Sequence, residues 1–348
     1  MIPPPRTEQA AVARLPYPDG WFALAASHEL KAGKVLTRRL MGEDVVLYRT
    51  TSGALRAVRP YCPHLGAHLG HGGTVQGDNL RCPFHHFQFG LDGACVKTGY
   101  GTPPPLRTRL AVLEHREIDG FVFVWRHALG AAPSWEIDPL PAADFPTPRC
   151  VVRELEDHPQ EVLENAFDLG HFRPVHGVPV TYLHDPQFDG TRAVVSMTVK
   201  SNGVDPRPGA FSLLSPTGRL VAQGLGIIQS EVEIARLGLH FRFWVFSTPV
   251  DPGLLAFTMA ASMRLAGHRF AGPANALASA AVAHFFAWDA GRDFDIWQNK
   301  IPLSRPRLAQ GDGPIMQYRR WAQQFYSPQD GAEEPLGDSG PSPSRDRP

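Results

Sequence analysis

Short apolar runs separated by glycine and proline dominate the first 130 residues of the chain. Examples are Trp21–Leu24, Asp44–Tyr48 and Phe121–Trp125. Runs of this length, rich in aromatic and β-branched residues, are typical of β-strands, and glycine and proline are typical of the turns between them. The pattern predicts an N-terminal segment over residues 1–20 and a mostly β domain over residues 21–130.

The pattern changes after residue 130. Residues 131–149 are rich in proline and predict an irregular connection. Beyond it we expect a domain over residues 150–326 that combines strands with two helices, and a disordered tail over 327–348, which is rich in Gly, Pro, Ser and Asp. The expected strands are 150–153, 193–199, 220–234, 239–246 and 255–263, and the expected helices are about 160–172 and 274–300. The predicted fold class is α+β, with an all-β domain followed by a helix-grip-like domain, an antiparallel sheet with a long C-terminal helix.

Composition limits the possible partners and the compartment. Lys plus Arg and Asp plus Glu both number 34, so no net charge directs the chain to nucleic acid. Four cysteines are too few for a disulfide framework, which favours a reducing compartment and a cytoplasmic protein.

The first residues of the chain show no apolar region of the kind that a secretory signal requires. Ala271–Trp288 is interrupted by polar residues and predicts a buried or amphipathic helix, so we expect no integral membrane segment.

Two short motifs carry soft metal ligands. Cys62-Pro-His64 is followed, after seventeen residues, by Cys82-Pro-Phe-His85, and both lie in loops rich in proline and glycine. In a Rieske 2Fe-2S cluster one iron takes two cysteine sulfurs and the other takes two histidine nitrogens. We therefore predict that Cys62 and Cys82 bind one iron and His64 and His85 the other, which indicates electron transfer.

A zinc site is the main alternative, because two cysteines and two histidines also form a zinc set. Zinc-finger spacing groups like ligands together, whereas each motif here carries one of each kind. His86 is one residue too far along to match the ligand spacing, and we interpret it as a neighbouring or surface group.

A second cluster of candidate ligands lies at Asp168, His171 and His176. On a straight helix Asp168 and His171 share a face, but His176 lies about 140° from His171. Pro174 can bend the chain and bring the two imidazoles together. Two histidines and one carboxylate form the facial triad that holds Fe(II) and leaves positions open for oxygen and substrate.

Other interpretations of this second cluster remain open. Taken alone, it also fits a polar helix end with two hydrogen-bonded histidines. The chain could be an electron carrier fused to a ligand-binding domain, or a redox sensor, although it shows no helix-turn-helix or basic patch as an output module. A cluster that delivers electrons and an iron that binds oxygen make chemical sense together, which favours an oxygenase.

With both motifs in place, residues 20–326 resemble the oxygenase component of Rieske non-haem iron oxygenases. The resemblance implies that His171 and His176 bind iron, that Asp168 bridges the two metal sites, and that the third ligand is an aspartate on a late helix.

The match around Arg292–Lys300 favours Asp293 as this third ligand. It leaves Asp289 and Asp295 as surface charges and His284 as a packed histidine. Asn165, in the same motif as Asp168, is a further candidate catalytic residue.

The late segments Asp295–Lys300, Asp312–Ile315, Tyr318–Trp321 and Gln324–Tyr326 are similar to 3-ketosteroid 9α-hydroxylases and cholesterol 7-desaturases. This implies a large apolar polycyclic substrate, a steroid or sterol, with a non-steroid aromatic or secondary-metabolite compound as the alternative. Candidate pocket or core residues are the apolar side chains Phe211, Leu213, Leu214, Leu225, Ile227, Ile228, Phe241, Phe243, Trp244, Phe246, Phe257 and Met259.

The resemblance also implies the reaction and the partners. O2 is the co-substrate, and the product is hydroxylated or desaturated. The chain has no Gly-x-Gly-x-x-Gly fingerprint, so electrons from NAD(P)H must come through a separate ferredoxin reductase or ferredoxin. Family members form head-to-tail homotrimers, in which His85 of one subunit would hydrogen-bond Asp168 of the next.

Overall fold

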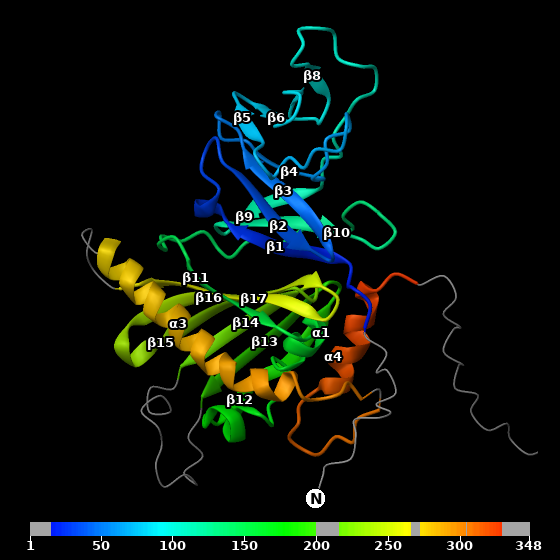
Figure 1. Ribbon diagram of the computed structural model, residues 1–348. Helices are drawn as coiled ribbons and strands as arrows, with labels where there is room; N and C mark the ends of the chain where they lie inside the picture. Colours follow the sequence, from blue (N-terminus) through cyan, green and yellow to red (C-terminus); the bar gives the residue numbers. More distant parts are fainter. Residues whose placement is uncertain (1–14, 200–215, 266–271, 304, 329–348) are drawn as a thin grey trace, which may run out of the picture.

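The computed structural model describes residues 15–199, 216–265, 272–303 and 305–328. Figure 1 shows two parts, one above the other, with the N-terminal strands in the upper part and a large sheet crossed by a long helix in the lower part. The predicted fold class, an all-β domain followed by an antiparallel sheet with a long C-terminal helix, is confirmed.

The N-terminal part contains three small antiparallel sheets. Their strands run in the orders β1-β10-β9, β2-β3-β4 and β5-β6-β7-β8. The bounds are β1 Gly20–Ala26, β2 Val35–Leu40, β3 Glu43–Arg49, β4 Leu55–Val58, β5 Thr74–Gln76, β6 Asn79–Arg81, β7 Gln88–Phe89, β8 Cys95–Lys97, β9 His115–Ile118 and β10 Phe121–Arg126, with a short 3-10 helix at Ser27–Glu29.

Strand β10 shows why this part folds as a layered structure. Its residues are apolar on both faces, and alternate side chains join different cores: Phe121 and Phe123 face one cluster, whereas Val122 and Val124 face another. A strand buried on both sides has no polar face, and the period-two alternation directs successive residues to opposite sides. The sheet that contains β10 therefore lies between two apolar layers.

The C-terminal part is built on one seven-stranded antiparallel sheet, in the order β11-β17-β16-β15-β14-β13-β12. Helix α3, Gly272–Trp297, packs on β17 and β11, and buries the small side chains Ala283 and Ala287. The other bounds are β11 Arg149–Leu155, α1 Pro159–Glu164, β12 Val180–Asp189, β13 Arg192–Val199, β14 Thr217–Gln223, β15 Ile227–Ile234, a 3-10 helix at Ala235–Leu237, β16 Leu239–Asp251, β17 Leu254–Arg264, α4 Ile315–Ala322 and a 3-10 helix at Gln323–Phe325.

Several predicted elements need correction. The helix expected over 160–172 ends at Glu164, because the following residues form turns. The single strand expected over 220–234 is two strands, since a turn at residues 224–226 interrupts it. Strand β12 was missed, because its alternating pattern is weak and half-exposed. The predicted tail beyond residue 328 and the pocket candidates Phe211, Leu213 and Leu214 lie outside the described residues.

The two parts share an apolar core rather than a loose linker. Phe121 of β10 lies 5.3 Å from the Trp244 ring and 4.7 Å from the Phe246 ring, both on β16, measured between ring centroids. The backbone amides of Met41 and Gly42 also donate to carbonyls of β16. A buried aromatic interface of this kind fixes the relative position of the two parts. Among the residues described here, no helix is both long and apolar enough to cross a membrane.

Candidate metal centres

The two cysteine motifs form a pair of similar loops at the tip of the N-terminal part. The amide of Cys62 donates to the carbonyl of Ala67, and the amide of Cys82 donates in the same way to Phe87, both at 2.8 Å. Both cysteines are buried and carry free thiols, and burial raises the pKa of the Cys62 thiol to about 11. A positively charged metal would reverse that preference, because a coordinated thiol loses its proton.

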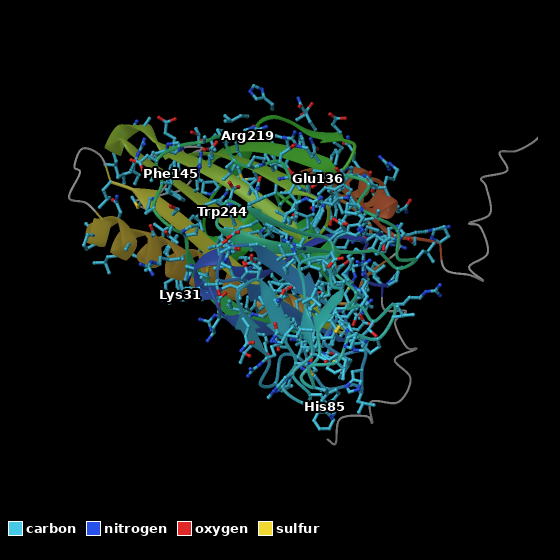
Figure 2. All side chains as sticks on the ribbon, turned by 90° about the horizontal axis from the view of Figure 1, so that it is seen from above. Lys31, His85, Glu136, Phe145, Arg219 and Trp244 are labelled. Carbon is cyan, nitrogen blue, oxygen red and sulfur yellow. The ribbon has the colours of Figure 1, made fainter. Side chains whose placement is uncertain are left out.

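The two histidines of these motifs lie side by side. The ring centroids of His64 and His85 are 4.8 Å apart with their planes at 78°, and His64 stacks on Phe87 at 4.2 Å. Both are half-buried, and Figure 2 places His85 at the outer edge of the molecule. Two buried thiols and two adjacent imidazoles are the donor set of a Rieske cluster, so the residues fit that group.

Glycine 99 fits closely against the loop that carries His85. A Cβ added at Gly99 would lie 2.2 Å from the carbonyl oxygen of His85, which is closer than atoms can approach. We expect Gly99→Ala to displace the loop, at a cost typical of overpacking, about 1–3 kcal/mol, and to lower the visible cluster absorbance per protein. Gly90→Ala is the matched control, since its Cβ would make only ordinary contact, 3.4 Å from Val96. Equal absorbance in both variants would contradict this prediction.

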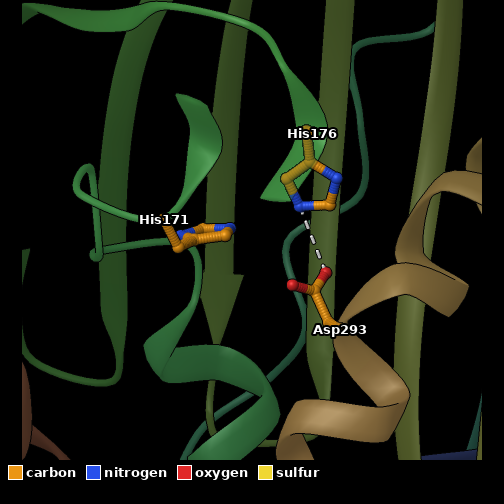
Figure 3. A group of neighbouring side chains, drawn as sticks. All are labelled: His171, His176 and Asp293. Carbon is orange, nitrogen blue, oxygen red and sulfur yellow. Dashed lines mark ion pairs between the residues drawn. The ribbon is translucent and has the colours of Figure 1, made fainter. Parts of the chain in front are cut away.

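The second centre lies between a turn after α1 and helix α3. One ligand atom from each of His171, His176 and Asp293 lies within 4.8 Å of the others, and Nε2 of His176 is 3.2 Å from Oδ2 of Asp293. Figure 3 shows the three side chains pointing toward one another, with strands of the large sheet behind them. Two imidazoles and a buried carboxylate around one point are the donor set of a 2-His-1-carboxylate iron site, so these residues fit Fe(II).

A π-helical turn brings the two histidines together. Residues Phe172–His176 form this turn, and Gly177 closes it in the left-handed conformation at φ 70°, with its amide directed at the Arg173 and Phe172 carbonyls. The wider π turn places residues five apart nearly above one another, and such turns are frequent at functional sites. Pro174 lies inside this turn, and the bend predicted at this residue takes the form of a wide turn of the backbone.

Asp289 was wrongly interpreted as a surface charge. Its Oδ2 lies 3.2 Å from Nδ1 of His176, on the side of the ring away from Asp293. Arg292 joins the same group, since it donates to the carbonyl of Val175 and its Nε lies 3.7 Å from Asp289. A carboxylate behind a ligating histidine holds the ring in one orientation. The signal in the sequence was the four-residue spacing of Asp289 and Asp293 on one helix.

Replacing Asp289 with asparagine should weaken iron binding without removing it. The amide keeps the size of the side chain but loses the charge that faces His176, and losses of such outer partners typically lower metal affinity by roughly 10-fold or more. Iron content at increasing chelator concentration measures this. Asp295→Asn is the control, because Asp295 is exposed and lies on a different face of α3 from Asp293, which faces the histidines. Identical chelator resistance in the two variants would rule out an orienting role.

The remaining predicted residues surround His171. Nδ1 of His171 lies 2.7 Å from the backbone carbonyl of Asp168, whose side chain is 32% exposed. The side-chain amide nitrogen of Asn165 lies 3.4 Å from Nε2 of His171, and Trp297 donates to the oxygen of the same amide. A turn, and not the shared helix face that the spacing suggested, therefore brings Asp168 close to His171.

One prediction on helix α3 is wrong: His284 was predicted to be packed but is exposed.

The charges of the second centre favour a cation. Burial alone would lower the pKa of His176, but the carboxylates of Asp289 and Asp293 outweigh it and raise that pKa to about 9. Burial lowers the pKa of His171, and Asp168 opposes this. Without a metal, His176 therefore carries a proton at neutral pH, and a bound cation would have to displace it.

Comparison with known proteins identifies a matching domain family for each part of the chain. Residues 20–109 match the Rieske [2Fe-2S] domain, and residues 124–326 match the 3-ketosteroid 9α-hydroxylase C-terminal domain. The chain is 32% identical to cholesterol 7-desaturase nvd of Bombyx mori over 318 residues, covering 90% of this chain and 70% of the relative. It is 29% identical to the oxygenase component of 3-ketosteroid-9-alpha-monooxygenase of Rhodococcus rhodochrous over 340 residues, 88% of this chain and 79% of the relative.

Solved structures share the fold. NdmA of Pseudomonas putida CBB5 with caffeine superposes with a TM-score of 0.66 at 19% identity, over 87% of this chain and 89% of that one. Dicamba monooxygenase bound to dicamba gives 0.62 at 17% identity, over 88% and 96%.

The fold and the two centres therefore define the class of the protein, an oxidoreductase that depends on a 2Fe-2S cluster, Fe(II) and O2. The chain belongs to the Rieske non-haem iron oxygenases, with a C-terminal domain of the 3-ketosteroid 9α-hydroxylase family.

Proposed function

We propose that Cys62, His64, Cys82 and His85 hold the 2Fe-2S cluster and that His171, His176 and Asp293 hold the mononuclear Fe(II). The support is the geometry and the donor types. One ligand atom from each of His171, His176 and Asp293 lies within 4.8 Å of the others. The His64 and His85 rings lie side by side, 4.8 Å apart between centroids, and Cys62 and Cys82 are buried free thiols in the neighbouring loops. When bound, the two groups supply single-electron transfer and oxygen activation.

The protein residues around the inner site have separate tasks. The Asp168 carbonyl accepts from Nδ1 of His171 and so directs the opposite nitrogen, Nε2, toward the metal position. The Asp289 carboxylate lies 3.2 Å from Nδ1 of His176, and its charge favours the ring orientation that directs Nε2 toward Asp293. Asn165, held by Trp297, lies beside His171, where its amide can orient a polar group at the site. Three protein ligands leave part of the coordination sphere for oxygen and substrate.

The substrate class that fits best is a steroid or sterol, which the chain would hydroxylate or desaturate. The single observation that carries this proposal is the match of residues 124–326 to the 3-ketosteroid 9α-hydroxylase C-terminal domain, the domain that contains His171, His176 and Asp293. The apolar inner face of the large sheet, with Phe257, Met259 and Phe243, is compatible with such a substrate.

Electrons would come from NAD(P)H through a separate reductase or ferredoxin, in the cytoplasm. The active form would be a head-to-tail homotrimer, in which His85 of one subunit contacts Asp168 of the next. Both residues are accessible for this contact: His85 lies at the outer edge of its part, and Asp168 is 32% exposed. The two candidate centres also lie in different parts of the chain, one above and one below the shared core.

The test is turnover of the metal-loaded protein with a surrogate ferredoxin and reductase, NADH and O2 against sterols, 3-ketosteroids and simple aromatics. Mass spectrometry identifies the product. A steroid product that gains one oxygen supports hydroxylation, and one that loses two hydrogens supports desaturation. Turnover of the aromatics alone would keep the oxygenase class but reject the steroid assignment.

A further inference from the structure

Ser230, on strand β15, carries a buried hydroxyl. The residue is 0% exposed, and its Oγ has no hydrogen-bond partner among the residues that the structure describes. A hydroxyl removed from water without a compensating hydrogen bond is costly, and such groups are rare in folded proteins. An unpaired group of this kind calls for a physical explanation.

The neighbours of Ser230 on the sheet are all apolar. Leu220 on β14 and Phe243 on β16 lie directly opposite it on the two sides, and Ile228 and Val232 flank it along its own strand. Residues paired across antiparallel strands, and residues two apart on one strand, point to the same face. The hydroxyl is therefore a single polar group within an apolar patch.

This patch faces the same side of the sheet as the inner metal site. Leu220, Ile228 and Phe243 belong to or pack against the core beneath α3, and the Phe243 ring stacks on Phe286 of α3 at 4.9 Å. Phe286 precedes Asp293 by seven residues, so the two share a helical face and lie about 10 Å apart along the axis. Ser230 is paired with Phe243, which contacts Phe286 of α3. It therefore lies on the sheet face beneath α3, about two helical turns from the level of Asp293.

The residues around Ser230 on this face are only half-buried, which leaves accessible space beside them. Leu220 and Phe243 are half-buried, and so is Gly218, which lies opposite Val232 and where an added Cβ would make ordinary contact with Val232 at 3.5 Å. Met197 lies opposite Gly218 on the other side and is half-buried. A flexible, half-buried methionine can move aside when an apolar ligand enters.

We propose that the Ser230 hydroxyl hydrogen-bonds the terminal hydroxyl or carbonyl group of an apolar fused-ring substrate whose reacting carbon lies at His171, His176 and Asp293. The proposal rests on the proposed function and adds the residue that selects and orients the substrate. A rigid fused-ring skeleton is long enough to span the distance between Phe286 and Asp293, and the unpaired hydroxyl gains its missing partner when the substrate binds.

The experiment compares wild type and Ser230→Ala, both loaded with metals, with three ligands of one skeleton: 5α-androstane, androstan-3-one and androstan-17-one. Dissociation constants are measured for all six pairs. We expect the wild type to bind at least one ketone roughly fivefold more tightly than the hydrocarbon, the range of one hydrogen bond, and Ser230→Ala to bind all three alike. The affinity for the hydrocarbon should be the same in both proteins.

Retained ketone preference in Ser230→Ala, or no preference in the wild type, would overturn the role of Ser230 alone. Failure of the wild type to bind any of the three would overturn the steroid assignment itself. Ser262→Ala is the folding control, because Ser262 is also fully buried but donates to the Pro146 carbonyl on the other face. The melting temperature should fall in Ser262→Ala, which loses a hydrogen bond, and should not fall in Ser230→Ala, which loses an unsatisfied hydroxyl.

Discussion

Asp168→Asn should slow turnover by roughly 100-fold while both metals remain bound. The local structure tolerates the change, because His171 is oriented by the backbone carbonyl of Asp168, which asparagine retains. The side-chain oxygen that accepts from the His171 amide at 3.3 Å is also retained. What disappears is the negative charge of a partly exposed side chain, which in the proposed trimer faces His85 of the next subunit.

The measurement combines product formation with metal analysis on the same preparation. Iron and sulfide content and the visible cluster spectrum should match the wild type, whereas reoxidation of the prereduced cluster by O2 with substrate present should slow in step with turnover. Loss of iron along with activity would show that Asp168 acts by supporting the inner site. Normal turnover with both metals bound would reject the bridging role.

Asp293→Ala should abolish turnover and remove the inner iron, while the cluster spectrum persists. Asp293 is 5% exposed, and its carboxylate lies 3.2 Å from Nε2 of His176, at the point where the three candidate ligands meet. Loss of a direct ligand should lower iron affinity by more than roughly 100-fold, beyond the range for outer partners such as Asp289. The cluster loops lie in the other part of the chain and do not depend on this side chain.

Iron per protein, measured after dialysis against a chelator, decides the outcome, with cluster absorbance as the internal reference. Asp295→Ala is the matched control, since Asp295 is on the same helix but exposed. Retention of one mononuclear iron per chain in Asp293→Ala would assign the third ligand to another carboxylate, and Asp289 would be the first to test because it is also close to His176.

Local patterns predicted most of the architecture. The apolar alternation located β1, β3, β10 and β17, and the late Ala-rich stretch located α3 to within a few residues. The patterns failed where local preference was weak or misleading. Strand β12 is half-exposed along its length, and the segment after Glu164 has helical spacing but forms turns and a π-helical turn. Tertiary contacts with α3 and the sheet override the helical preference there.

The candidate site residues fall into the same two groups, those that local sequence patterns predicted and those that they could not. The four predicted ligands of the N-terminal motif lie in two loops, and their spacing alone predicts the donor set. The choice among Asp289, Asp293 and Asp295 could not be made by chemistry, because all three are carboxylates on one helix. The sequence also could not separate the candidate pocket residues from core residues. Ile227, Trp244 and Phe246 face the core between the two parts of the chain. Phe257 and Met259 face α3.

The sequence by itself predicted the two donor sets and determined the order of the domains and the family, because these depend on residue types and on short spacings along the chain. The resemblance had already favoured Asp293. Only the tertiary structure showed that Asp289 lies behind His176 and that the Ser230 hydroxyl, on an apolar face, has no partner among the described residues. These properties depend on which face of α3 and which face of the sheet each residue occupies, and packing between distant segments sets those faces.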